Sequence, residues 1–177
     1  MDSGSTALPD LSGIENIFIY VGDAVRWDFL PEQIAKMGTT VKTVSASIHS
    51  PTSFASLATG TYPPVHGVFS FTNRISPEVP SIFDQKRYET RFVNSVREQS
   101  AEVDPIFSVL NQSPDEREVP FENLSSPFIV MERGPGGHAP YGQFDGTAPE
   151  YFTSRRTASA SLFRSEYETA VEDGVLR

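Results

Sequence analysis

Three polar residues of this chain follow or precede expected secondary-structure elements at positions suited to chemistry. Asp23 comes after the apolar run 16–21, Ser50 stands at the expected start of a helix, and His138 follows the apolar run 127–131. A carboxylate is a hard oxygen ligand for Ca²⁺ or Mg²⁺. A hydroxyl at a helix N-terminus lies beside free backbone N–H groups that stabilise an anion, and an imidazole exchanges its proton near neutral pH. These residue types predict a site that handles a cation, an anion and a proton.

The elements expected to position these residues alternate between strands and helices. Residues 16–21, 40–46, 90–94 and 127–131 are rich in β-branched or aromatic side chains and predict strands. Helical patterns separate or follow them, which indicates an α/β fold with a mostly parallel sheet and helices on both faces. We expect the run 16–21 to be buried on both faces of this sheet. Ligands of such sheets gather beyond the carboxyl ends of the strands, so Asp23 and Ser50 are expected to converge there.

Ser50 and Pro51 predict the start of a helix, with Ser50 as the N-cap and Pro51 as the first helical residue. The helix is expected to run to about residue 58 and to end at Gly60. Capping alone would also account for Ser50, and a turn would account for Asp23. Two more helices are predicted, one after Asp104 and Pro105 and one at 159–173, the latter with an amphipathic pattern.

The segment 16–67 resembles the first half of a sulfatase of the alkaline phosphatase superfamily. The family pattern around the nucleophile is C/S/T-x-P-S-R-x-x-L-x-T-G, and Leu57, Thr59 and Gly60 match it with Ser50 at the nucleophile position. His66 and Gly67 follow in family order, and the family's His-Gly implies a structural role for His66. The segment from His138 to Tyr141 is similar to the family's H-x-P-Y. Over roughly residues 14–172 the chain is thus identified as sulfatase-like, of a type seen in salt-loving archaea.

The resemblance implies a role for each of these residues. Asp23 and Ser50 would bind a divalent metal, Ca²⁺ or Mg²⁺, Ser50 would attack the ester, and His138 would assist the leaving group. A loop histidine held by turn geometry is the alternative for His138. The family's Pro is displaced to Pro51 and its Arg is replaced by Phe54, so we expect no conversion of Ser50 to formylglycine. The family's second metal motif, Asp-His-Gly, has no match in the chain.

The function expected from this resemblance is metal-dependent hydrolysis of small-molecule sulfate or phosphate monoesters. Because the Asp-His pair is missing, we expect an N-terminal portion of a catalytic domain, with 1–13 loosely held and 14–177 forming an incomplete sulfatase-like domain that hydrolyses esters poorly by itself. The alternative is a catalytically inactive fragment that acts as an interaction module. A dinucleotide-binding domain is disfavoured because no G-x-G-x-x-G follows the first strand.

Composition narrows the partners and the compartment. The chain has 177 residues with 23 acidic and 14 basic side chains, a net charge of -9, which argues against nucleic-acid binding. Only three of the 14 basic residues are lysines, which resembles proteins of salt-loving archaea; an acidic mesophilic protein is the alternative. There is no cysteine, no signal-peptide pattern and no apolar run near the roughly 18 residues of a membrane span. A cytoplasmic protein without membrane or nucleic-acid partners is expected; the sequence leaves its oligomeric state open.

The segment 134–142 is rich in glycine, and we consider two roles for it. It could present backbone N–H groups to an oxyanion. As a nucleotide-binding motif it is weak, because it lacks the lysine of a P-loop and a helix directly after it.

Overall fold

The computed structural model describes residues 13–96, 105–113, 123–142 and 144–176. The chain divides into two compact units. Unit 1 comprises Met1–Ile19, Val44–Asn94 and Glu102–Glu132, and unit 2 comprises Tyr20–Thr43, Ser95–Ala101 and Arg133–Arg177. The predicted loose N-terminus, 1–13, lies outside the described residues except for Gly13.

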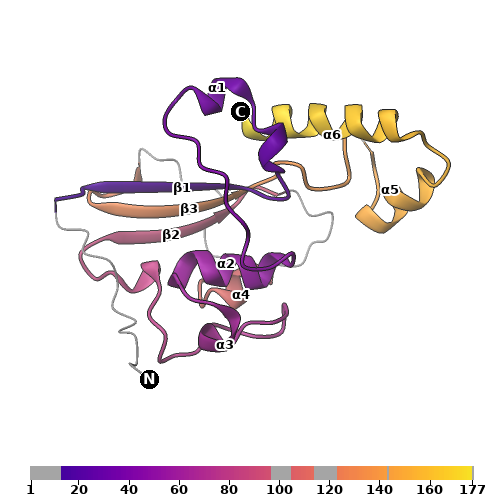
Figure 1. Cartoon of the computed structure of the whole chain (residues 1–177). Helices are drawn as coiled ribbons and strands as arrows, with labels where there is room; N and C mark the ends of the chain where they lie inside the picture. The colour runs from indigo at the N-terminus through magenta and orange to yellow at the C-terminus, as the bar shows by residue number, and fades with distance from the viewer. Residues whose placement is uncertain (1–12, 97–104, 114–122, 143, 177) are drawn as a thin grey trace. The chain divides into compact units, whose positions relative to one another are not determined.

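Three strands form one parallel sheet, which confirms the predicted α/β class (Figure 1). They are β1 (Asn16–Gly22), β2 (Glu89–Asn94) and β3 (Phe128–Gly134), in the order β1-β3-β2. β3 is the central strand, and its residues Ile129, Val130 and Met131 are at most 2% exposed. A strand with neighbours on both sides and apolar residues at successive positions is buried on both faces.

Two strand predictions need correction. β1 is an edge strand whose side chains alternate between exposed and half-buried, with Phe18 47% exposed, so the expected burial on both faces is wrong. Residues 40–46 form no strand. Their β-branched side chains lie in solvent, with Val41 69% and Val44 96% exposed. β-propensity reflects fit to a half-buried pleated surface, and this segment finds no such surface.

Unit 1 is organised around aromatic side chains. Its helical elements are α2 (Ser50–Thr59), α3 (Pro63–His66), the 3-10 turn η2 (Ile82–Asp84) and α4 (Ile106–Val109). The ring of Phe92 on β2 makes edge-to-face contacts with rings from three of them, at centroid distances of 5.1 to 6.5 Å: Phe54, Phe83 and Phe107. Each such pair contributes about 0.5–1.5 kcal/mol beyond area burial. α2 is thereby fixed against β2.

The predicted helix around residues 51–58 is confirmed, with its start one residue earlier than expected. Ser53 donates its backbone N–H to the carbonyl of His49, so His49 is the N-cap and Ser50 is the first helical residue. Pro51 occupies the second position, where its missing N–H costs nothing. Gly60 ends the helix in the left-handed conformation, φ 66°, as expected.

Unit 2 contains the 3-10 turn η1 (Trp27–Phe29) and helices α1 (Glu32–Ala35), α5 (Ala148–Ser154) and α6 (Ala160–Val175). α6 confirms the predicted C-terminal helix, and the Ser159 side chain caps it by accepting from the N–H of Leu162. The predicted cap Asp104 of α4 lies outside the described residues. None of the helices in the described part of the chain has the length and hydrophobicity to span a membrane.

Candidate functional site

Asp23 lies at the carboxyl end of β1, in a turn that is tied to the end of β3. Its backbone N–H donates to the carbonyl of Gly134 at 3.1 Å, and its own carbonyl accepts from the N–H of Gly137 at 2.9 Å. The next residue, Ala24, has a φ of 59°, which is uncommon for a residue with a Cβ. These bonds hold the two strand ends together in unit 2.

The Asp23 carboxylate forms a buried ion pair with Arg133, which was not anticipated from the sequence. Nε and Nη2 of Arg133 both donate to Oδ2 of Asp23, at 2.9 and 2.7 Å. The Arg133 side chain is 2% exposed and that of Asp23 11%. A guanidinium this deeply buried needs a carboxylate partner, because an unpaired buried charge costs several kcal/mol. Asp23 is therefore first of all the counter-ion of Arg133.

His138 ends the glycine-rich turn that follows β3. Its backbone N–H donates to the carbonyl of Pro135 at 2.8 Å, which closes the turn, and its side chain is half-buried. Because Gly137 on the same turn is bonded to the carbonyl of Asp23, the backbone segments that carry Asp23 and His138 lie side by side. The structure thus brings together the loops of two of the three predicted site residues.

The glycines of this turn serve close packing. A Cβ on Gly136 would lie 2.6 Å from the carbonyl oxygen of Asp23, and a Cβ on Gly137 would lie 2.9 Å from that of Ala24. Gly136 also has a φ of 47°. The N–H of Gly137 is already bonded within the protein, so packing accounts for this cluster better than the oxyanion role considered from the sequence.

Ser50 begins α2, and a set of serine hydroxyls fixes the segment before it. Ser53 on the first turn donates its hydroxyl to the carbonyl of Ser47 at 2.8 Å and shares a hydrogen bond with the hydroxyl of Ser45 at 3.0 Å. The hydroxyl of Ser47 accepts from the backbone N–H of His49 at 3.0 Å. The half-buried Ser50 is thereby held at the positive end of the helix dipole.

Ser50 belongs to unit 1, whereas Asp23 and His138 belong to unit 2. The expected convergence of Ser50 with Asp23 therefore stays a prediction. No group of three or more His, Cys, Asp or Glu side chains suited to a metal occurs among the described residues. Since the Asp23 carboxylate is already paired with a cationic side chain, these residues do not by themselves fit a divalent ion. The metal at Asp23 and Ser50 stays a prediction as well.

His66 is fully buried and satisfied on both ring nitrogens, as its expected structural role requires. Nδ1 accepts from the N–H of Val68 at 3.1 Å, so Nε2 carries the proton and donates to the hydroxyl of Ser56 at 2.9 Å. Gly67 follows with a φ of 77° and caps α3. His66 thereby fixes the turn after α3 to α2.

Burial lowers the pKa of His66 below its usual 6.5, so the stability of the chain should depend on pH. In the unfolded chain His66 binds a proton below that pH, whereas the folded chain resists it. The neutral His66 side chain makes its full contribution to the free energy of unfolding above pH 6.5. As the pH falls from there toward the folded-state pKa, the free energy of unfolding decreases by at most about 1.4 kcal/mol per pH unit. Denaturant unfolding across this range should show the decline, and His66→Gln should flatten it. Equal slopes for the two proteins would contradict this origin.

Comparisons with known proteins give one relative and no family. No family model matches the chain, and no solved structure matches it. The chain is 32% identical over 134 residues to the low-salt glycan biosynthesis sulfotransferase Agl7 of Haloferax volcanii. The matched region covers 74% of the present chain but 32% of the relative. The chain is thus similar to about a third of a protein named for transferring sulfuryl groups in glycan synthesis.

Proposed function

We propose that this chain is the part of a sulfuryl-transfer enzyme that carries the nucleophile, and that the enzyme modifies glycans. The observation that carries the proposal is the similarity to a glycan biosynthesis sulfotransferase. The segment from Ser50 to Gly60 supports it, because it places a hydroxyl on the first turn of a helix that ends at the expected glycine. The activity and the substrates of the whole protein are part of this proposal, because the matched region covers only 32% of the relative.

Hydrolysis and transfer of a sulfuryl group share their first step. The Ser50 oxygen attacks the sulfur of a sulfate ester, the bond from sulfur to the leaving oxygen breaks, and the proton of the Ser50 hydroxyl passes to that leaving oxygen. We assign this proton transfer to His138, because an imidazole ring has one nitrogen that can accept a proton and one that can donate it. In the second step an acceptor hydroxyl attacks the sulfur of the sulfated serine, the bond from sulfur to the Ser50 oxygen breaks, and the proton of the acceptor passes to that oxygen. Water as the acceptor makes the enzyme a sulfatase, and a sugar hydroxyl makes it a sulfotransferase.

The mechanism requires that Ser50 and His138 reach the same ester. Their convergence is therefore part of the proposal. The start of α2 favours an anion through its free N–H groups and dipole, worth about 0.3–1 kcal/mol at an exposed site. No step is assigned to a divalent ion, because the carboxylate of Asp23 is already paired with Arg133. Phosphate esters would fit the same nucleophile.

Removing the Ser50 hydroxyl tests the proposal. The intact gene product from its native cells is incubated with an aryl sulfate as donor and a methyl glycoside as acceptor, and release of the phenol is measured. We expect Ser50→Ala to lower turnover by at least about a thousandfold, as loss of a nucleophile does. The matched control is Ser161→Ala, an exposed serine near the start of α6, which should retain activity.

Two outcomes of this assay would count against the proposal. Turnover that persists in Ser50→Ala would show that another group attacks the sulfur. A folded protein that turns over neither the aryl sulfate nor an aryl phosphate assayed in the same way would favour the alternative function, a catalytically inactive interaction module. The pairing of Asp23 with Arg133 is the observation that favours this alternative, because it neutralises the predicted metal ligand.

A further inference from the structure

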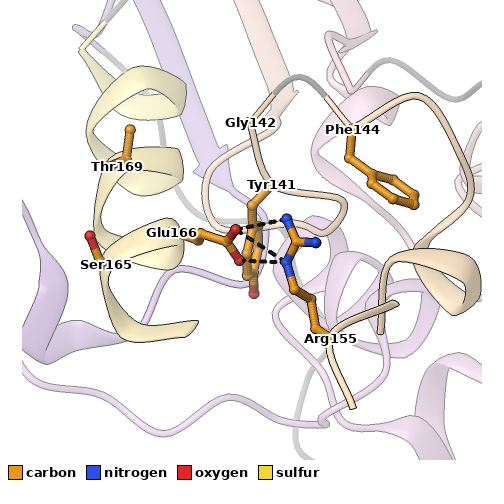
Figure 2. Close-up of a pocket in the computed structure, with 7 residues that line it drawn as sticks. All are labelled: Tyr141, Gly142, Phe144, Arg155, Ser165, Glu166 and Thr169. Atoms are coloured by element: carbon orange, nitrogen blue, oxygen red, sulfur yellow. Dashed lines mark hydrogen bonds and ion pairs between the residues drawn. The ribbon is translucent and has the colours of Figure 1, made fainter. Parts of the chain in front are cut away.

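Unit 2 contains a pocket that none of the predicted site residues lines. Its volume is about 460 Å³, within the range of small-molecule sites. It is formed between the loop after β3, the end of α5 and the middle of α6, by the residues drawn in Figure 2: Tyr141, Gly142, Phe144, Arg155, Ser165, Glu166 and Thr169. The polar residues of the lining come mainly from α6.

The polar part of the pocket is an ion pair in a fixed geometry. The Arg155 guanidinium faces the Glu166 carboxylate, with Nη2 2.9 Å from Oε1 and Nε 3.2 Å from both oxygens (Figure 2). The buried Tyr151 donates its hydroxyl to the same carboxylate and lies under the guanidinium, 5.1 Å from ring centroid to Cζ. Tyr151 thus holds both Arg155 and Glu166 in place. Ligand binding therefore does not have to pay the entropy cost of ordering these two side chains.

The charges of this group are fixed across the neutral range. The hydrogen bonds from Arg155 and then from Tyr151 lower the pKa of Glu166, so it stays a carboxylate. Burial, and next the hydrogen bond to Glu166, raise the pKa of Tyr151 to about 12, so its phenol stays a donor. Arg155 and Glu166 therefore cancel each other's charge, and the pocket has polar groups without a net charge from this pair.

The rest of the lining is aromatic or carries hydroxyls. Tyr141 and Phe144 are half-buried, and their rings lie edge-to-face against Tyr151 at 5.2 and 5.4 Å. Ser165 and Thr169 are exposed on successive turns of α6. A hydroxyl both donates and accepts hydrogen bonds. The pocket thus combines aromatic surface, which is packed against Tyr151, with charged and uncharged hydrogen-bonding groups.

We propose that this pocket binds an uncharged sugar ring, as the acceptor subsite of the glycan; the role as acceptor rests on the proposed function. A sugar ring presents C–H groups on its face and hydroxyls at its edge, which suits aromatic surface beside an ion pair and two hydroxyls. The Glu166 oxygens accept from sugar hydroxyls, and the Arg155 N–H groups donate to them. A sulfate or phosphate anion is the poorer fit, because the carboxylate next to Arg155 repels it.

Ligand-observed NMR on the full chain tests this assignment. The probes are the methyl glycosides of glucose, galactose and mannose, and saturation transfer from protein to the sugar C–H protons is measured with and without inorganic sulfate. We expect transfer to at least one glycoside, without competition by sulfate. Thr169→Tyr should fill the pocket and weaken this binding by about tenfold or more. Thr153→Tyr, at an exposed threonine of α5 outside the lining, should bind as the unaltered chain does.

The assignment is overturned by any of three results: no saturation transfer to a folded chain, equal binding by Thr169→Tyr, or displacement of the sugar by sulfate. Ser50→Ala separates this test from that of the proposed function. It should leave glycoside binding unchanged whether or not Ser50 proves to be the nucleophile, because Ser50 does not line the pocket.

Discussion

Arg133→Met is expected to destabilise the chain by about 3–5 kcal/mol. The substitution leaves the Asp23 carboxylate, which is 9% exposed, without the guanidinium that donates to it twice. The buried carboxylate then lacks two charge-assisted hydrogen bonds, so its desolvation opposes folding. Denaturant unfolding followed by circular dichroism measures the loss.

Two further variants show whether the pairing is the cause. Arg133→Met combined with Asp23→Asn removes both charges and should be more stable than Arg133→Met alone. Arg164→Met breaks the exposed pair with Glu168, where the arginine is 69% exposed, and should cost less than about 1 kcal/mol. Additive effects of the two substitutions at Asp23 and Arg133 would show that these side chains do not depend on each other.

Gly174→Ala is expected to destabilise the chain by about 1–3 kcal/mol, although alanine is the better helix former. Gly174 lies near the end of α6, where a Cβ would come within 2.7 Å of the backbone N and O of Gly136. Both contact atoms belong to the backbone of the turn that carries His138, so neither can move without shifting that turn. The hydroxyl of Tyr20 on β1 also donates to the carbonyl of Gly174.

The sign of the change identifies its cause. Helix propensity alone predicts that Gly174→Ala stabilises α6 by about 0.8–1 kcal/mol, whereas the contact with Gly136 predicts the opposite. Ser165→Ala, at an exposed position in the middle of the same helix, gives the effect of helix propensity without the contact. A Gly174→Ala variant that melts above the unaltered chain would show that α6 does not pack on this turn.

The sheet could be predicted from the sequence because its strands are short β-branched or aromatic runs bounded by turn residues. The same signal failed at 40–46, since local pattern does not reveal whether a neighbouring strand edge exists to receive a segment. α2 was predictable from Pro51 and Gly60, whose backbone preferences are local.

The site was less predictable, because it depends on contacts distant in sequence. The place of Asp23 after a strand predicts a metal ligand, but its partner Arg133 is 110 residues away in the sequence. The only hint was an arginine close to the end of a strand that is otherwise apolar. The pocket around Glu166 was missed for the same reason: it forms where a loop and two helices meet, and no motif spans them.

The central claim, that Ser50 carries the sulfuryl group, is tested most directly by the mass of the peptide that contains it. The intact protein is incubated with an aryl sulfate, quenched in acid, digested, and sequenced by a fragmentation method that preserves sulfate esters. Before incubation we expect an unmodified serine, and after it the added mass of one SO₃ group on Ser50, absent from Ser50→Ala. Turnover without sulfation of Ser50, sulfation at another residue, or a formylglycine at position 50 would contradict the account.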